Sequence, residues 1–148
     1  GLPDLAFDAP YYYHALTEGE RDSRANLTAD FCQLDDHYFI RTSLELPIIG
    51  HKDTFSYGVW LSVSEKNFLR YWDTFDAEDT PHDRYVGWVA NLIPGYPNTL
   101  ELKGAAHTRA TLRPSLELEP SDHPLAVLQR DGVDLEDLIN ICSELMHR

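Results

Sequence analysis

The chain has 148 residues, of which 43% are hydrophobic and 25% are charged, a composition typical of one globular domain with a full hydrophobic core. The 12 basic residues stand against 25 acidic ones, which gives a formal net charge of −13 and disfavours contact with nucleic-acid phosphates and anionic membrane surfaces. We therefore predict a single domain over residues 1–148 that binds neither nucleic acid nor a membrane.

The first predicted helix follows an extended segment. Prolines limit helix formation in residues 1–10. Thr17 and Glu20 then have the spacing of a capping box, which predicts a short helix running toward Ala25. Because most of its side chains are charged, we expect this helix to lie on the surface.

Two long antiparallel strands are predicted at residues 38–46 and 55–63. Both segments alternate apolar and polar residues, as half-buried strands do. Asp35 and Asp36 are predicted to form a hairpin turn before the first of these strands. Ser64 then caps a helix in which Phe68, Leu69 and Trp72 are spaced for one face.

The second half of the chain contains further predicted strands and two helices. We expect strands at residues 84–93, 99–103 and 112–119, with a turn at 94–98. Ser121 or Asp122 is predicted to cap a helix that has Pro124 in its first turn and ends at Gly132. Asp134 is predicted to cap an amphipathic C-terminal helix whose apolar residues recur at helical spacing: Leu135, Leu138, Ile139, Cys142, Leu145 and Met146.

This order of elements predicts the fold class. Hairpin-like connections dominate and regular βαβ crossovers are lacking, which indicates an α+β domain. We expect a mainly antiparallel, twisted sheet of about five to six strands with helices packed on it, including the amphipathic C-terminal helix.

The two cysteines, Cys32 and Cys142, have no Cys-x-x-Cys spacing. This argues against a disulfide framework and against a thiolate zinc site in these residues, so both are interpreted as core thiols. No signal peptide or apolar run of roughly 20 residues is present. The sequence therefore predicts a cytoplasmic protein with no cofactor and no metal.

His123 is the candidate catalytic residue, with Asp122 beside it. The common nucleophile, phosphate-loop, dinucleotide and zinc-protease motifs are absent from the sequence. An imidazole near a helix N-terminus stays neutral, because the helix dipole disfavours its protonation, and could act as a general base. The alternative is that His123 only packs and hydrogen-bonds at the helix cap.

Other polar groups are less specific. The acidic loop at residues 73–83 has oxygens for a hard cation but lacks the EF-hand pattern, so a solvated loop is the preferred interpretation. The His14 and Glu18 pair and the His82-Asp83 pair have no metal-specific spacing.

The second face of the predicted sheet is the candidate binding surface. Alternation places six residues on the side opposite the main apolar set: Arg41, Glu45, Trp60, Trp88, Lys103 and Glu117. Tryptophan and arginine supply much of the binding energy at interfaces. Alternatively, the N-terminal segment with Phe7 and residues 11–13 folds back and buries the tryptophans.

The succession of motifs resembles a known family. The motifs that carry this resemblance are Phe39-Ile40-Arg41, Leu44-Glu45-Leu46-Pro47-Ile48, residues 57–64, Gly87-Trp88, residues 94–100, Ser121-Asp122-His123-Pro124-Leu125-Ala126 and Gln129-Arg130. Together they cover nearly the whole chain and are similar to the bacterial domain-of-unknown-function family 2199. The resemblance implies a small bacterial cytoplasmic protein with no established activity, substrate or cofactor.

The same resemblance implies a further feature upstream. Many members carry a zinc-knuckle-like Cys-x-x-Cys segment and a histidine before a Leu-Pro that corresponds to Leu2-Pro3 here. This chain begins after that point, so zinc is not predicted for these residues.

Two hypotheses for function follow. The first is a protein- or peptide-binding module, regulatory or immunity-like, that recognises a partner through the face with Trp60 and Trp88 or through the His123 turn. Strong acidity favours a basic partner. The alternative is a small hydrolase-like enzyme in which His123 and Asp122 act on an anionic small molecule bound by basic side chains, namely Arg41, Arg113 and Arg130. We favour binding because no activated nucleophile is visible.

Overall fold

The computed structural model describes residues 5–77, 79 and 81–146. Over these residues the chain forms five α-helices, one 3₁₀-helix and eight strands that belong to one sheet. The α+β class is confirmed. The expected simple twisted sheet of about five to six strands is wrong, because the sheet has eight strands and five of them close into a barrel.

The barrel consists of β4 (His37–Pro47), β5 (Thr54–Val63), β6 (Arg84–Val89), β7 (Lys103–His107) and β8 (Ser115–Leu118). Each strand pairs antiparallel with the next, and β8 then pairs with β4 in parallel at Ser43 and Ser115. Five up-and-down strands leave the first and last strands pointing the same way. Closure therefore requires this parallel contact.

The interior of the barrel is built by the alternation that the sequence predicted. Ile40, Thr42, Leu44 and Leu46 of β4 are fully buried, and Thr42 donates from its hydroxyl to the carbonyl oxygen of Val59 over 2.8 Å. The buried residues of β5 on the same face are Phe55, Tyr57, Val59, Leu61 and Val63. These two long strands therefore supply much of the core.

Two glycines allow the strands to approach closely. Gly87 and Gly104 are cross-strand partners in β6 and β7. A Cβ atom at Gly87 would lie 1.9 Å from the carbonyl oxygen of Ser62, and one at Gly104 would lie 2.7 Å from that of Glu117. A side chain at either position would force the neighbouring strands apart.

The N-terminal segment covers part of the outside of the barrel. β1 (Leu5–Ala6) pairs parallel with β5, α1 (Tyr11–His14) follows, and α2 (Glu18–Arg24) has the predicted capping box between Thr17 and Glu20. β2 (Ala25–Leu27) and β3 (Phe31–Leu34) then extend the sheet beside β4 through the predicted two-residue turn at Asp35.

A second, smaller core lies under this segment. It contains Cys32, Leu34, Phe39, Trp60 and Ala90, with Phe7, Tyr13, Leu16 and Leu27 packed against it. Cys32 is thus a core thiol as predicted, and burial raises its pKa to about 12. The thiol is therefore protonated at neutral pH.

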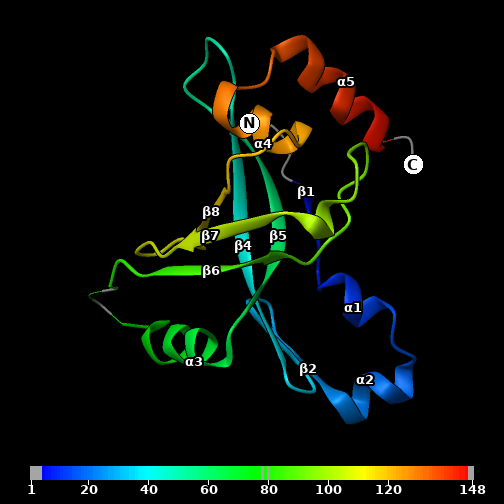
Figure 1. Cartoon of the computed structure of the whole chain (residues 1–148), viewed down its shortest axis with the longest axis vertical. Helices are drawn as coiled ribbons and strands as arrows, with labels where there is room; N and C mark the ends of the chain where they lie inside the picture. The colour runs from blue at the N-terminus through cyan, green and yellow to red at the C-terminus, as the bar shows by residue number, and fades with distance from the viewer. Residues whose placement is uncertain (1–4, 78, 80, 147–148) are drawn as a thin grey trace.

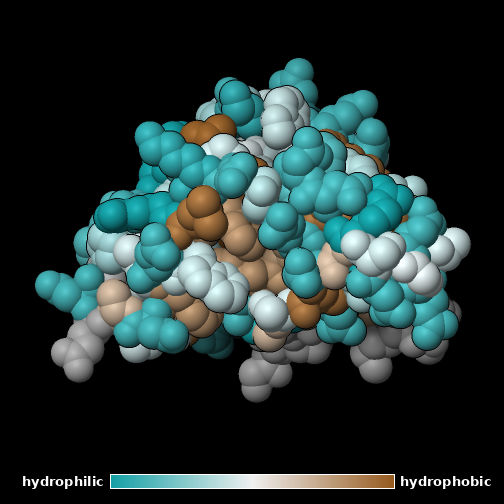
Figure 2. Space-filling model, turned by 90° about the horizontal axis from the view of Figure 1, so that it is seen from below, coloured by the Kyte–Doolittle hydropathy of each residue, from teal (hydrophilic) through white to brown (hydrophobic). Residues whose placement is uncertain are grey.

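The helix α3 (Glu65–Thr74) begins at the predicted cap, Ser64, and lies at the lower left of Figure 1. Its buried residues are Phe68 and Tyr71, whereas Leu69 and Trp72, expected on the buried face, are about half exposed. The view from below shows apolar side chains gathered among hydrophilic ones on this side of the molecule (Figure 2).

The helices α4 (Pro124–Asp131) and α5 (Leu135–Met146) lie at the other end of the barrel (Figure 1). Gly132 ends α4 as predicted, and Asp134 Oδ1 accepts from the amide of Glu136 at the start of α5. Leu138 is buried, but Leu135 and Ile139 are exposed, so the buried stripe of α5 is narrower than predicted. None of the helices in the described residues is long and apolar enough to cross a bilayer.

Three strand predictions need correction. β6 ends at Val89 rather than residue 93, and β8 occupies only the middle of 112–119. Residues 99–101 form a 3₁₀-helix, η1 (Thr99–Glu101), and the strand follows at β7. Leu2, Pro3 and Glu78 lie outside the described residues.

Candidate functional site

The outward side of β6, β7 and β8 forms an exposed sheet face, which we call the open face. Three cross-strand rows make it up: Arg84, His107 and Ser115; Val86, Ala105 and Glu117; and Trp88, Lys103 and Glu119, whose amide donates to the carbonyl oxygen of Lys103. Apart from Ala105, His107 and Ser115, these side chains are exposed. The face therefore combines aromatic, aliphatic and charged groups within reach of a partner.

Trp88 is the largest exposed side chain of the open face. Its side chain is 51% exposed, and the Lys103 ammonium lies 5.9 Å from the centre of its ring. An ammonium at this distance from an indole makes a favourable cation–π contact. This contact helps to hold the ring in place on the surface.

Trp88 also forms one wall of a groove of about 560 Å³, which we call the aromatic groove. Its apolar lining comes from the α1–α2 segment, the β3–β4 hairpin, β6 and η1: Tyr12, Leu16, Leu34, Phe39, Trp88, Val89 and Leu100. Tyr12 is exposed and packs over Phe39 with 6.0 Å between ring centres. The groove thus offers a largely apolar floor between two exposed aromatic rings.

One rim of the aromatic groove is held by ion pairs. Arg24 contacts Asp35 over 2.7 Å and Glu20 over 2.9 Å. Hydrogen bonds from Arg24 lower the pKa of Asp35, and the same bonds raise the pKa of Arg24. This rim therefore stays charged, with one guanidinium set against two carboxylates, and it joins α2 to the hairpin.

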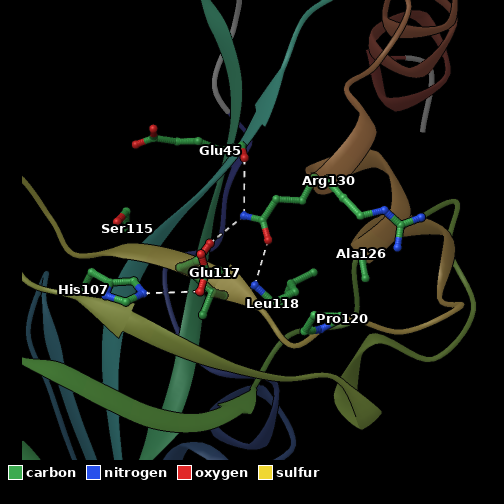
Figure 3. Close-up of a pocket in the computed structure, with 10 residues that line it drawn as sticks. Glu45, His107, Ser115, Glu117, Leu118, Pro120, Ala126 and Arg130 are labelled. Atoms are coloured by element: carbon green, nitrogen blue, oxygen red, sulfur yellow. Dashed lines mark hydrogen bonds and ion pairs between the residues drawn. The ribbon is translucent and has the colours of Figure 1, made fainter.

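At the other end of the open face, β4 and β8 diverge beyond Ser43 and Ser115 and leave a pocket of about 500 Å³, which we call the seam pocket (Figure 3). Gln129 of α4 bridges the two strands. Its Oε1 accepts from the amide of Leu118 over 2.7 Å, and its Nε2 donates to the carbonyl oxygens of Leu116 over 2.7 Å and of Glu45 over 3.4 Å. The side-chain amide therefore replaces the missing strand-to-strand hydrogen bonds.

Ionisable groups line the seam pocket. His107 Nε2 lies 3.7 Å from Glu117 Oε1, and Arg109 contacts Glu45 over 2.9 Å. Figure 3 shows the guanidinium of Arg130 on the opposite side of the pocket from the His107–Glu117 pair. Ser115 is the cross-strand partner of His107, but no hydrogen bond joins their side chains.

The chain matches a known protein family. The family model described as "Uncharacterized protein conserved in bacteria (DUF2199)" matches residues 1–133. The chain belongs to this family. The match includes the whole barrel and α4 and ends just before α5. No curated protein and no solved structure matches the chain.

The two predicted tryptophans have different surroundings. Trp60 is fully buried, because the N-terminal segment covers it and its Nε1 donates to the carbonyl oxygen of Phe7 over 2.9 Å. Of the two alternatives, burial by the N-terminal segment therefore holds for Trp60, and a shared exposed Trp60 and Trp88 surface is wrong. Trp88, Lys103 and Glu117 do lie together on the outer face.

His123, the candidate base, occupies the N-cap of α4. Its Nδ1 accepts from the amide of Leu125 over 3.1 Å, and its Nε2 lies 2.9 Å from the carbonyl oxygen of Pro97. Because a carbonyl only accepts, Nε2 carries the proton in this arrangement. The cap is His123 and not Ser121 or Asp122, and both of its ring nitrogens already have structural partners.

The predicted arginines are not gathered around His123. Arg130 pairs with Asp131. Arg41 and Arg113 instead bind the turn at residues 29–30, where Arg41 donates to the carbonyl oxygen of Ala29 over 3.3 Å and Arg113 contacts Asp30 over 2.8 Å. The structure therefore does not assemble the proposed cleft of His123, Asp122 and three arginines.

Metal ligands do not gather either. In the part of the chain that the structure describes, no group of three or more His, Cys, Asp or Glu residues could hold a metal ion.

Sequence reasoning did not identify Tyr12, Phe39, His107 and Gln129 as members of a surface site. The sequence predicts that Tyr12 lies in a covering segment and Phe39 in a strand, and it predicts no strand that includes His107. Gln129 was visible only as part of the family motif. Its bridging role depends on a gap between β4 and β8, which are far apart in the sequence.

Proposed function

We propose that this protein is a binding module that recognises a basic segment of another protein, with Trp88 and the aromatic groove receiving an apolar side chain of that segment. The observation that carries the proposal is the half-exposed Trp88 at the edge of an apolar groove of about 560 Å³. Exposed, well-positioned aromatic residues beside a pocket are the usual anchors of a protein interface.

Charge argues for a cationic partner. The chain has a net charge of −13, which attracts basic proteins over long range and accelerates their association. Close to Trp88, the side chain of Glu117 is 72% exposed, and His107 Nε2, which lies 3.7 Å from its Oε1, carries a charge only when the imidazole is protonated. Asp36 in the hairpin turn and Glu101 in η1 are also exposed. A lysine or arginine that flanks the apolar anchor can pair with these carboxylates.

Binding is favoured over catalysis by the same geometry. The nitrogens of His123 are engaged in holding α4 and the 94–98 turn. His107 and Glu117 lie on an exposed surface, where water screens their interaction. An immunity-like or regulatory role in the cytoplasm, in which the module covers a basic surface of its target, is consistent with this proposal.

The test uses a short flexible peptide in which lysines flank a central leucine, titrated into the full chain by calorimetry. We expect saturable binding that Trp88→Ala weakens at least tenfold, the effect typical of an interface anchor. Trp72→Ala is the matched control, because Trp72 is equally exposed but lies on α3, away from the open face.

Two further peptides complete the experiment. Replacing the lysines by glutamate is expected to abolish binding, and replacing the leucine by serine is expected to weaken it as much as Trp88→Ala does. Equal losses in the Trp88→Ala and Trp72→Ala proteins, or equal affinity for the glutamate peptide, would contradict the proposal.

A further inference from the structure

A third pocket, which shares no lining residue with the aromatic groove or the seam pocket, has a different chemistry. It has a volume of about 380 Å³ and lies between α3 and the loop that joins β7 to β8. Tyr71 and Phe75 supply aromatic rings, Leu112 an exposed aliphatic chain, and Arg109 and Arg113 positive charge. We call it the arginine pocket. Its volume falls within the range of small-molecule sites.

Positive charge is concentrated here against the trend of the whole chain. Three guanidinium groups, on Arg41, Arg109 and Arg113, are held close to two carboxylates, on Asp30 and Glu45. These five groups together carry an excess of one positive charge in a chain with a net charge of −13, and Arg109, Arg113 and Asp30 are the ones that line the pocket itself. Arg41 has no carboxylate partner in the described residues, and its buried Nε has no hydrogen-bond partner there.

The guanidinium of Arg113 is held in place through its Nε, but its Nη nitrogens are not hydrogen-bonded within the described residues. Its Nε donates to Asp30 Oδ1 over 2.8 Å, while its two Nη nitrogens have no partner within the described part of the chain. The two Nη groups form a fork that matches the two oxygens of a carboxylate. Because Asp30 fixes the other edge of the guanidinium, little side-chain entropy remains to be lost on binding.

The loop that carries Arg113 is held in a strained conformation. Thr111 has a φ of 64°, a value that is rare for β-branched residues and marks backbone strain. The Arg109 side chain holds the loop through two hydrogen bonds to the carbonyl oxygen of Arg113, over 2.9 and 2.7 Å. Strain of this kind persists where the surrounding contacts over-determine a local geometry, often at ligand sites.

We propose that the arginine pocket binds a small organic acid, whose carboxylate is received by the Nη fork of Arg113 and whose apolar body packs on Phe75 and Leu112. This site is independent of the surface that binds the basic partner. A ligand here would lie between α3 and the β7–β8 loop.

The experiment is a chemical-shift titration of the isotopically labelled full chain with phenylacetate, and in parallel with phenylacetamide, which has the same shape but no charge. We expect saturable shifts at Phe75, Thr111 and Leu112, and a dissociation constant for phenylacetate at least tenfold lower than for the amide. Arg113→Gln is expected to remove this difference, whereas Arg113→Lys, which keeps the charge and loses the fork, retains part of it.

Arg130→Gln is the control, because Arg130 is also exposed and paired with a single aspartate but lies in the seam pocket. It is expected to bind phenylacetate as the unmodified chain does. Absence of saturable shifts, equal affinity for acid and amide, or unchanged affinity in both Arg113 variants would each overturn the proposal. None of these outcomes bears on the binding of the lysine-containing peptide.

Discussion

The indole Nε1 of Trp60 donates a hydrogen bond to the carbonyl oxygen of Phe7, 53 residues earlier in the chain, over 2.9 Å. Two adjacent hydrogen bonds also join the N-terminal segment to the barrel. The backbone amide of Trp60 donates to Asn91 Oδ1, and Asn91 Nδ2 donates to the carbonyl oxygen of Ala9. This buried network fastens the N-terminal segment to the barrel. It also holds Tyr12 and Leu16 in place as one wall of the aromatic groove.

We predict that Trp60→Phe destabilises the fold by about 1–3 kcal/mol, because it leaves the carbonyl oxygen of Phe7 without its buried donor. Trp88→Phe, which changes an exposed ring on the neighbouring strand, is expected to alter the stability by no more than about 0.5 kcal/mol. Urea denaturation of both variants measures the difference. Equal stabilities would show that the network does not hold the segment.

Gln129 is predicted to stabilise the seam between β4 and β8. Gln129→Ala removes one acceptor and one donor that serve the backbone of β8, and we expect a loss of about 1–3 kcal/mol in the free energy of unfolding. Arg130→Ala, at the next position but exposed, is the control and is expected to cost little. Amide exchange at Leu118 should accelerate in the first variant alone; unchanged protection there would argue against the bridge.

Close approach of strands at Gly87 gives a further prediction. Gly87→Ala would place a Cβ against the backbone oxygen of Ser62, and the overpacking should cost about 1–3 kcal/mol or more. Gly19→Ala is the comparison, because nothing lies within 4 Å of its added Cβ and alanine favours a helix by up to about 1 kcal/mol. The melting temperature should fall in the first variant and hold or rise in the second, and the reverse order would refute this barrel geometry.

Acid sensitivity is predicted at Asp83. Hydrogen bonds from Arg70, over 3.0 Å, and from the Tyr85 hydroxyl, over 2.9 Å, lower the pKa of this carboxyl. The unfolded chain, in which the pKa returns to about 3.9, therefore binds the proton more tightly. The stabilisation is present above that pH and is lost as the pH falls through the lower, folded-state value.

Asp83→Asn should flatten the dependence of the unfolding free energy on pH in this acidic range. Asp131→Asn is the control: its carboxylate also has a lowered pKa but is 59% exposed, against 24% for Asp83. We expect a smaller change there, because solvent screens the exposed pair. A pH profile of Asp83→Asn identical to that of the unmodified chain would disprove the assignment.

The long strands could be predicted because burial leaves a local pattern. β4 and β5 have one fully buried face, so their apolar residues alternate over many positions. β7 could not be recognised in this way, because its centre is Gly104-Ala105-Ala106, small residues that strand packing requires and that show no alternation. Closure of the barrel depends on the contact of Ser43 with Ser115. These residues are far apart in the sequence, and no local sequence pattern predicts that their strands pair.

The residues of the outer face could be predicted in part, because the alternation along a strand also shows which side chains point outward. Alternation correctly places Trp88, Lys103 and Glu117 outside the barrel, since direction is a local property of a strand. Whether an outward side chain stays exposed depends on what else packs there. Trp60 is covered by a segment far away in the sequence and Trp88 is not, and the two have similar sequence surroundings.

The proposed function is tested most directly by the indole N–H signals of the three tryptophans during titration with the lysine-and-leucine peptide. We predict that the Trp88 signal shifts and saturates with the peptide, while the Trp60 signal, hydrogen-bonded to Phe7 in the interior, and the Trp72 signal on α3 stay in place. A saturating shift of Trp72 with no change at Trp88, or no shift at any tryptophan, would contradict a binding surface at the open face.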